Sequence, residues 1–139
     1  MNEAFIADSS VGVSWAVESQ SDEATDELLD RVASGTPLIV PPLWPLEVAN
    51  SLLVLLRRKK LQPDDRDRAL DALSRLPFVI DDECPRLAWG RISELAVEHG
   101  LSVYDATYLE LATRRNLPLA SRDDALRKAA QACRVKLLL

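Results

Sequence analysis

Short apolar segments alternate with amphipathic helical patterns along the chain, and this alternation restricts its possible folds more than any other feature. No hairpin dipeptide such as Asn-Gly joins two of the apolar segments. Strands separated by helices pair in parallel, and a parallel sheet is buried on both faces. The predicted fold is therefore α/β, a three-layer α/β/α sandwich with a central parallel sheet. Strands are expected over residues 5–7, 38–40, 78–80, 117–120 and 135–139.

The segments between these strands carry the capping residues and the 3.6-residue periodicity of helices. Helices are expected over residues 9–17, 22–33, 43–60, 63–76, 85–98, 102–115 and 121–132. With 139 residues and no linker, repeat or low-complexity segment, residues 1–139 are expected to form a single domain.

Composition excludes several classes of protein. Hydrophobic residues make up 47% of the chain and charged residues 28%, but no apolar run reaches the roughly 18 residues of a membrane span. Cys84 and Cys133 are far apart and lack neighbouring ligands, which indicates reduced thiols in a cytoplasmic protein. A lone His99 gives little support to histidine-based catalysis. The net charge of −5 argues against binding nucleic acid through a broadly basic surface.

Four acidic residues follow predicted strands or open predicted helices. Asp8 follows the first strand, Glu47 lies one turn into the helix after the second, Asp105 lies in the first turn of its helix, and Asp123 follows the strand at 117–120. Ligands of such folds gather outside the carboxyl ends of the strands, so these four side chains are expected to converge. Each acid alone could be a helix cap, as the capping-box spacing from Ser102 to Asp105 illustrates.

Carboxylates without histidine or cysteine ligands suit Mg²⁺ or Mn²⁺. Such ions activate water and neutralise charge on a phosphodiester during its cleavage. Of two neighbouring acids, Asp123 is the predicted site residue, because Ser121 and Asp124 have the spacing of a capping box and Asp124 would then be part of a cap.

Four segments together resemble the PIN-domain nucleases, and most of all the VapC-type toxins of toxin–antitoxin pairs. They are Phe5-Ile6-Ala7-Asp8-Ser9-Ser10-Val11, Pro45-Leu46-Glu47-Val48-Ala49-Asn50, Tyr104-Asp105-Ala106-x-Tyr108-Leu109-x-Leu111-Ala112 and Leu119-Ala120-Ser121-x-Asp123-x-x-Leu126. The resemblance implies a PIN-like sandwich and an endoribonuclease that depends on Mg²⁺ or Mn²⁺, forms a homodimer and is neutralised by a cognate antitoxin.

The resemblance also assigns roles to residues. Asp8, Glu47, Asp105 and Asp123 would form the catalytic and metal-binding site, with Glu47 as a ligand or as the base for the attacking water. Ser10 and Ser121 stand where the family has small polar residues that support the site. RNA would be bound by some of the basic residues Arg57, Arg58, Arg114, Arg115 and Arg122.

The predicted helix over 43–60 carries leucines on more than one face, at positions 52, 53, 55 and 56. A one-sided surface helix needs fewer, so together with Trp44 and Trp15 this helix could form a surface for a second copy or for the antitoxin. The alternative is that these side chains simply pack in the core.

Two alternatives remain open. The chain could be a PIN-like binding module without catalysis, although all four acids are present. It could also be another Mg²⁺-dependent α/β phosphohydrolase, but a phosphatase of the haloacid-dehalogenase type needs an Asp where Ser10 stands. A receiver domain needs an acidic pair near the first strand and a Lys after the last, and this chain has neither.

Overall fold

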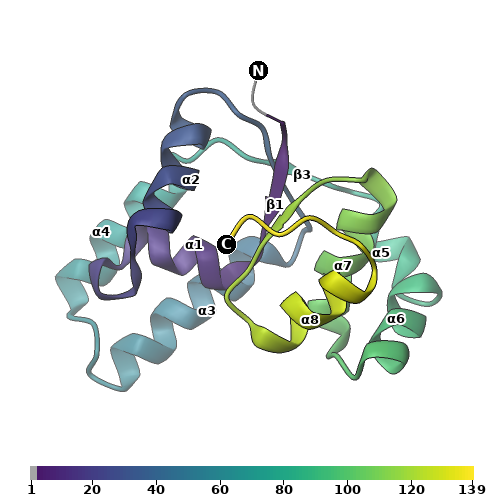
Figure 1. The fold of residues 1–139 in the computed structure, drawn as a ribbon. Coiled ribbons are helices and arrows are strands. Elements are labelled where there is room, and N and C mark those ends of the chain that lie inside the picture. Colours follow the sequence, from purple (N-terminus) through teal and green to yellow (C-terminus); the bar gives the residue numbers. More distant parts are fainter. Residues whose placement is uncertain (1–2) are drawn as a thin grey trace.

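A computed structural model describes residues 3–139 (Figure 1). Its helices and strands follow one another in this order: β1 (Phe5–Ala7), α1 (Ser9–Ala16), the 3₁₀ helix η1 (Glu18–Gln20), α2 (Glu23–Ala33), β2 (Leu38–Val40), α3 (Trp44–Arg57), α4 (Pro63–Ser74), β3 (Val79–Ile80), α5 (Cys84–Leu87), α6 (Arg91–His99), α7 (Val103–Arg115), β4 (Leu119–Ala120) and α8 (Asp124–Ala132).

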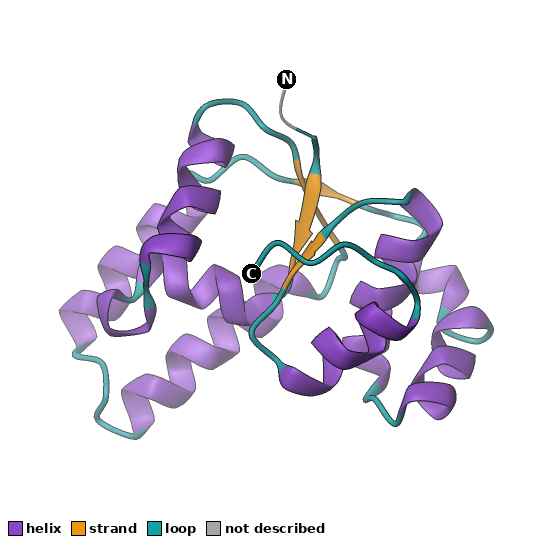
Figure 2. Ribbon diagram, viewed as in Figure 1, coloured by secondary structure: helices purple, strands orange, loops and turns teal. Residues whose placement is uncertain are grey.

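The four strands form one parallel sheet in the order β3-β2-β1-β4. The helices flank it as two groups: α1 to α4 contact one another beside the sheet, while α6, α7 and α8 pack together on its other side (Figure 2). The predicted α/β/α sandwich is confirmed. Among residues 3–139, no helix has both the length and the hydrophobicity needed to cross a membrane.

The centre of the sheet is fully buried, and this explains its continuous apolar strands. All three residues of β1 and all three of β2 are buried. The edge strand β3 is the exception, because Val79 and Ile80 are 52% and 46% exposed. Parallel strands covered on both faces need apolar side chains at every position rather than at alternate ones, as the sequence of β1 and β2 shows.

Two predicted elements differ from the structure. The helix expected over 85–98 is two helices, α5 and α6, separated at Gly90, a residue of low helix propensity. The strand expected over 135–139 is reduced to a single bridge between Leu119 and Leu137. Its partner β4 is only two residues long, and within β4 the backbone of Leu119 bonds to the last segment, at Lys136 and Leu138.

The junction before α7 follows the sequence prediction. Gly100 adopts the left-handed conformation (φ 64°) that ends α6 and that other residues rarely adopt. Two residues later, the Ser102 hydroxyl accepts a hydrogen bond of 3.0 Å from the Asp105 amide and caps α7. The start of α7, and with it Asp105, is therefore fixed by local sequence.

Candidate active site

The strand order reverses direction next to β1, and the candidate site lies at that point. The chain passes from β1 outward through β2 and β3, and β4 then pairs on the other side of β1. In open α/β sheets, the crevice at the carboxyl ends of the strands at such a switch point is where ligands bind. Asp8 directly follows β1, and Ser121 directly follows β4.

Asp8 is held by hydrogen bonds to both of its carboxylate oxygens. Its side chain is only 4% exposed, and its Oδ1 atom accepts hydrogen bonds from the Ser10 hydroxyl and from the Val11 amide, which makes it the N-cap of α1. Its Oδ2 atom accepts a hydrogen bond from the hydroxyl of Ser121, which is fully buried. Ser10 and Ser121 thus support Asp8 directly, at the positions that the sequence predicted.

The tryptophan at the start of α3 fixes this helix against Asp8. The indole Nε1 of Trp44 donates a 3.1 Å hydrogen bond to the backbone carbonyl of Asp8. The two helices can approach so closely because Gly12 has no side chain: a Cβ atom there would lie 2.8 Å from Trp44 and from Val48. The position of Glu47 in α3 relative to Asp8 depends on this contact.

Glu47 is half-buried and is oriented by a tyrosine from α7. The Tyr108 hydroxyl donates a 2.6 Å hydrogen bond to Glu47 Oε1. Burial, followed by the hydrogen bond to Glu47, raises the pKa of Tyr108 well above its ordinary value, so the hydroxyl keeps its proton and remains a donor. This bond ties α3 to α7, the helix that carries Asp105.

Asp123 has a different local role from the one predicted. It is itself the N-cap of α8, since its Oδ2 atom accepts a 2.8 Å hydrogen bond from the Leu126 amide, and Asp124 is the first helical residue. The predicted capping box from Ser121 to Asp124 is therefore wrong. The Ser121 hydroxyl donates to Asp8 instead and accepts a 3.0 Å hydrogen bond from the Asp123 amide, so one serine links two of the acids.

The charges of the four acids act on one another. Burial raises the pKa of Asp8, and the charge of Asp123 adds to this increase. Burial also raises the pKa of Asp105, followed by the charges of Asp123 and Asp8. The pKa of Glu47 is raised by burial and then by the charges of Asp105 and Asp8. The structure thus brings four carboxylates from distant parts of the chain into mutual electrostatic contact, as the sequence analysis expected.

The chemistry of these groups fits a hard divalent cation. Within residues 3–139, no three acidic, histidine or cysteine side chains are already arranged as a ready-made set of metal ligands. Mg²⁺ does not require such a set, because it usually keeps several waters and is bound by one or two carboxylates. Carboxylates whose pKa values are raised by burial and by one another's charge are a suitable place for a cation.

The five arginines proposed to bind RNA lie in three separate places. Arg57 and Arg58 are exposed at the end of α3. Arg122 follows β4, and its amide donates to Ser10 Oγ, while its guanidinium donates to the Gln20 carbonyl and pairs with Asp22. Arg122 is the one of the five that is joined to the Asp8 site by a hydrogen bond.

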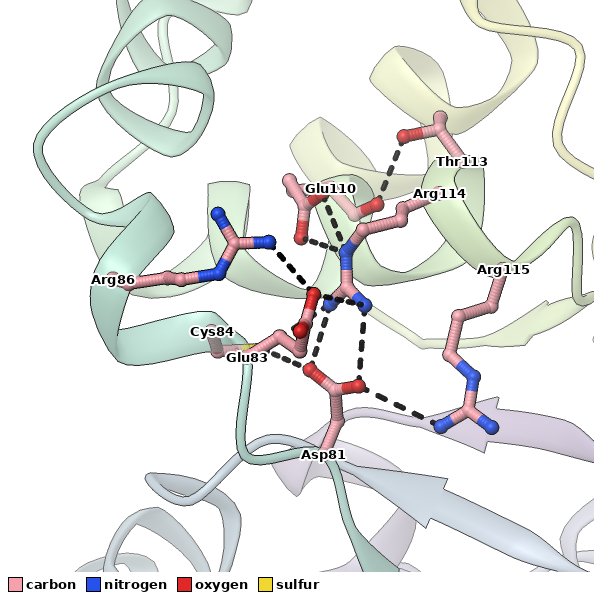
Figure 3. Close-up of polar contacts among 8 residues, drawn as sticks. All are labelled: Asp81, Glu83, Cys84, Arg86, Glu110, Thr113, Arg114 and Arg115. Atoms are coloured by element: carbon pink, nitrogen blue, oxygen red, sulfur yellow. Dashed lines mark hydrogen bonds and ion pairs between the residues drawn. The ribbon is translucent and has the colours of Figure 1, made fainter.

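Arg114 and Arg115 lie at the far end of α7 from Asp105 and pair with acids there (Figure 3). Arg114 bonds to both carboxylate oxygens of Asp81 and, through Nε, to Glu110 at 2.9 Å. Arg115 lies 3.6 Å from Asp81. The structure therefore does not bring these two arginines to the four acids, and their visible role is to join α7 to the segment after β3.

Sequence reasoning missed two residues that shape the site, Tyr108 and Trp44. Tyr108 was recognised only as part of the Tyr104–Ala112 segment, although its spacing from Asp105 places both on one side of α7. Trp44 was expected on a partner surface, which is wrong because its side chain is buried, and no pattern in the sequence distinguishes a site contact from core packing. Its burial (2% exposed) and its bond to the Asp8 carbonyl show that it serves both.

Comparison with known proteins identifies the family. The PIN domain family profile matches residues 5–132. Ribonuclease VapC1 of Mycobacterium tuberculosis, from strains CDC 1551 / Oshkosh and ATCC 25618 / H37Rv, is 33% identical over 102 residues, which cover 70% of this chain and 72% of VapC1.

Two solved structures share the fold. The crystal structure of PAE2754 from Pyrobaculum aerophilum matches with a TM-score of 0.70 and 21% identity, covering 99% of this chain and 92% of that one. VapBC2 from Rickettsia felis, bound to a DNA fragment from their promoter, matches with a TM-score of 0.63 and 15% identity, covering 96% of each chain. These two likenesses show the fold, and the family profile together with the VapC1 match shows that the chain belongs to the PIN domain family and is of the VapC type.

Proposed function

We propose that this chain is a metal-dependent endoribonuclease that acts as the toxin of a toxin–antitoxin pair. The observation that carries the proposal is the mutual electrostatic contact of Asp8, Glu47, Asp105 and Asp123 at the switch point of the sheet. Such a cluster is costly to keep without a function, because the ionisation of Asp8, Glu47 and Asp105 is disfavoured by the charges of their neighbours as well as by burial. The similarity to ribonuclease VapC1 supports RNA as the substrate.

Asp8, Asp105 and Asp123 are the residues that would hold Mg²⁺ or Mn²⁺, with Glu47 beside them. When bound, the ion would activate a water molecule and neutralise charge on the phosphodiester. Two oxygens of Asp8 are already oriented by Ser10 and Ser121, so this ligand needs little rearrangement to bind. Asp123 and Asp105 are oriented by their places at the first turns of α8 and α7.

Glu47 is the residue we assign as the base. Its Oε1 atom is occupied by the Tyr108 hydroxyl, which leaves Oε2 to accept the proton of the attacking water. The pKa of Glu47 is raised by burial and by the neighbouring acids, which strengthens it as a proton acceptor, while the hydrogen bond from Tyr108 limits the increase. As its proton passes to Glu47, the water attacks phosphorus, the bond from phosphorus to the leaving ribose oxygen breaks, and that oxygen takes a proton from solvent water.

RNA backbone would be bound by Arg122 next to the acids and by Arg57 and Arg58 further along α3. The amide of Arg122 bonds to Ser10 beside the acids, and its guanidinium, which bonds to the Gln20 carbonyl and to Asp22, would have to turn from these partners to contact a phosphate. The exposed Arg57 and Arg58 would contribute a salt-dependent attraction to phosphates. Acting on cellular RNA places the protein in the cytoplasm.

The partner of a VapC-type toxin is an antitoxin, and we propose that this chain also forms a homodimer. In α3, Leu52 is fully buried and belongs to the core. Leu53 and Leu56 are only half-buried, so they are the leucines we assign to a partner surface. Leu53→Glu and Leu56→Glu should each weaken self-association or antitoxin binding while the protein remains folded. If both variants sediment as the wild type and bind antitoxin equally well, the surface lies elsewhere.

The central experiment incubates the purified protein with mixed cellular RNA in Mg²⁺, in Mn²⁺ and in chelator, and maps the ends of the cut RNA by sequencing. We expect defined cuts that require the metal and that disappear in Asp105→Asn. Absence of cutting by the wild type, together with no Mn²⁺ binding by calorimetry, would contradict the proposal and identify a PIN-like binding module instead.

A further inference from the structure

A pocket of about 390 Å³ opens directly beside the catalytic acids, between α1 and α3. Its apolar floor is formed by Val13 from α1 and by Val54 and Leu55 from α3. Polar side chains from several elements complete its lining, among them Ser10, Asn50 and Arg122. We call this cavity the α1–α3 pocket. Its volume lies within the range of about 300–1,000 Å³ that small-molecule sites occupy.

The α1–α3 pocket is continuous with the proposed active site. Ser10 lines the pocket, and its hydroxyl donates to Asp8 Oδ1. Arg122 also lines the pocket, and its amide donates to the same Ser10 oxygen at 3.0 Å. One side chain therefore separates the pocket from the first catalytic carboxylate. A group attached to a phosphate that lies over the acids is within reach of the pocket.

We propose that the α1–α3 pocket is a nucleobase subsite, which binds the base next to the cleaved phosphodiester, and that Asn50 determines which base is preferred. The inference rests on the proposed ribonuclease function and adds to it the place where sequence is read. Single-stranded RNA is recognised by this combination of surfaces: an apolar or planar face that packs on the base, and polar groups that bond to its edge.

Each side of the pocket matches one part of a nucleotide. Val54 and Leu55 offer an aliphatic floor for a base face. Arg122, whose guanidinium bonds to the Gln20 carbonyl and to Asp22, places a positive charge at the pocket that attracts the phosphate of the same nucleotide. The amide of Asn50 carries both donors and an acceptor, which suits the edges of bases rather than the phosphate. Asn50 is exposed, so it contributes to the pocket without a role in the core.

A base is favoured over a partner's apolar side chain for two reasons. The lining is mixed rather than apolar, with an amide, a hydroxyl and a guanidinium around a small aliphatic floor. In addition, the pocket is separated from Asp8 only by Ser10, so it lies next to the place where a polynucleotide must lie if it is to be cut. A peptide segment would gain little from Asn50, because an unsatisfied polar group in a covered pocket weakens binding.

The first test is the sequence preference of cleavage. An RNA library randomised around a single-stranded site is cut by the wild type and by Asn50→Ala, and the cut ends are sequenced. Asn50→Ala should reduce the base preference at one position next to the cut by about tenfold, and leave the preferences at other positions unchanged. Gln131→Ala, which removes an exposed amide on α8, is the matched control and should cut like the wild type.

Filling the pocket gives a second variant with its own control. Val54→Phe should raise the KM for RNA about tenfold and alter the preference at the same position, whereas Val97→Phe on α6, where the valine is 86% exposed, should do neither. If Asn50→Ala keeps every preference, or if Val54→Phe cuts normally but no longer binds the antitoxin, the pocket belongs to a protein partner and the inference is wrong.

A binding measurement separates this inference from the proposed function. Isotope-labelled protein is titrated with each of the four nucleoside 5′-monophosphates, and the side-chain amide signal of Asn50 is followed by nuclear magnetic resonance. We expect shifts at Asn50 and Val54 that differ between the bases. If the wild type cuts no RNA but these shifts occur, the ribonuclease proposal fails and the base subsite stands. If none of the four shifts these signals, the subsite is overturned.

Discussion

The Tyr108 hydroxyl donates a 2.6 Å hydrogen bond to Oε1 of Glu47, although the two residues are 61 positions apart in the chain. The bond joins α7 to α3 and fixes the orientation of the one acid in the cluster that we assign as a base. Burial raises the pKa of Glu47, and the hydrogen bond from Tyr108 opposes part of this increase. Tyr108 is thus a positioning residue for Glu47.

Tyr108→Phe should lower kcat by about tenfold, within the range of about 10–100-fold that loss of a supporting hydrogen bond costs. Without the bond, the pKa of Glu47 rises, so the acid limb of the pH–rate profile should move to higher pH. Tyr104→Phe is the matched control, because Tyr104 lies on the same helix and is 63% exposed. A lower kcat with an unchanged pH profile would mean that Tyr108 acts only through packing.

Asp123→Asn and Asp124→Asn test which of two neighbouring acids belongs to the site. Asparagine is as good an N-cap as aspartate, so Asp123→Asn should keep α8 and remove only the charge. We expect its cleavage rate to fall at least a hundredfold, since it loses a metal ligand, and its Mn²⁺ affinity to fall as well. Asp124→Asn should cut within about threefold of the wild type. The opposite order of effects would assign the site to Asp124.

The sequence predicted the sheet and the acids well because both depend on local patterns. The apolar triplets at Phe5–Ala7 and Leu38–Val40 suit only strands buried on both faces, and the acids that follow parallel strands share one edge by topology. The same local reasoning predicted a capping box from Ser121 to Asp124, whereas Asp123 is the residue that caps α8. The Ser121 hydroxyl is bonded to Asp8, 113 residues away, and no local pattern reveals such a partner.

The arginines show a similar limit. Arg114 and Arg115 form a basic pair at a helix end, which from sequence alone is equally consistent with RNA binding and with ion pairing. Their partner Asp81 lies 33 residues before Arg114 in the chain, and it reaches α7 only because β3 pairs with β2. The predicted strand at 135–139 failed for a comparable reason, since its length depended on β4.

Arg114→Ala should destabilise the fold by about 3 kcal/mol, because it leaves two buried carboxylates without their partner. The side chains of Asp81 and Glu110 are 6% and 4% exposed, and both bond to this guanidinium (Figure 3). Burial opposes ionisation of Asp81, but the bonds from Arg114 and from Cys84 outweigh it and hold the pKa of Asp81 below its ordinary value.

Urea denaturation measures this loss, and Arg115→Ala is its control. The Arg115 side chain is 40% exposed and lies 3.6 Å from Asp81, so its removal should cost less than about 1 kcal/mol. The ion pair of Arg114 should be lost when Asp81 is protonated, which happens only as the pH falls below its ordinary value of 3.8. Equal destabilisation by the two variants would contradict the role assigned to the bidentate pair.

The last prediction concerns the stability of the metal-free protein. The pKa values of Asp8, Glu47 and Asp105 are raised in the folded state, from ordinary values of 3.8, 4.5 and 3.8. Between each ordinary value and the raised one, the folded protein binds more protons than the unfolded chain, so stability falls as the pH rises through that interval. In chelator, the protein should therefore melt at a higher temperature at pH 5 than at pH 7.5.

Acids whose pKa values are lowered in the folded state do not change the stability between pH 5 and pH 7.5. Asp22 and Asp81 have lowered pKa values, so the stability they contribute is lost only below pH 3.8. Solvent screens the half-buried Glu47 and Asp105, so Asp8 should be the main contributor to the difference in stability between pH 5 and pH 7.5.

Mn²⁺ and Asp105→Asn should each reduce this pH dependence, for different reasons. Mn²⁺ binds the folded site and hardly the unfolded chain, so at pH 7.5 it should raise the melting temperature as its concentration increases. Asp105→Asn removes one of the repelling charges, so the metal-free variant should melt higher than the wild type at pH 7.5 and gain less from Mn²⁺. Scanning calorimetry at both pH values, with chelator and with Mn²⁺, measures all of these changes. A variant that melts lower and keeps the full response to Mn²⁺ would show that Asp105 only starts α7, and the four-acid site would lose one of its members.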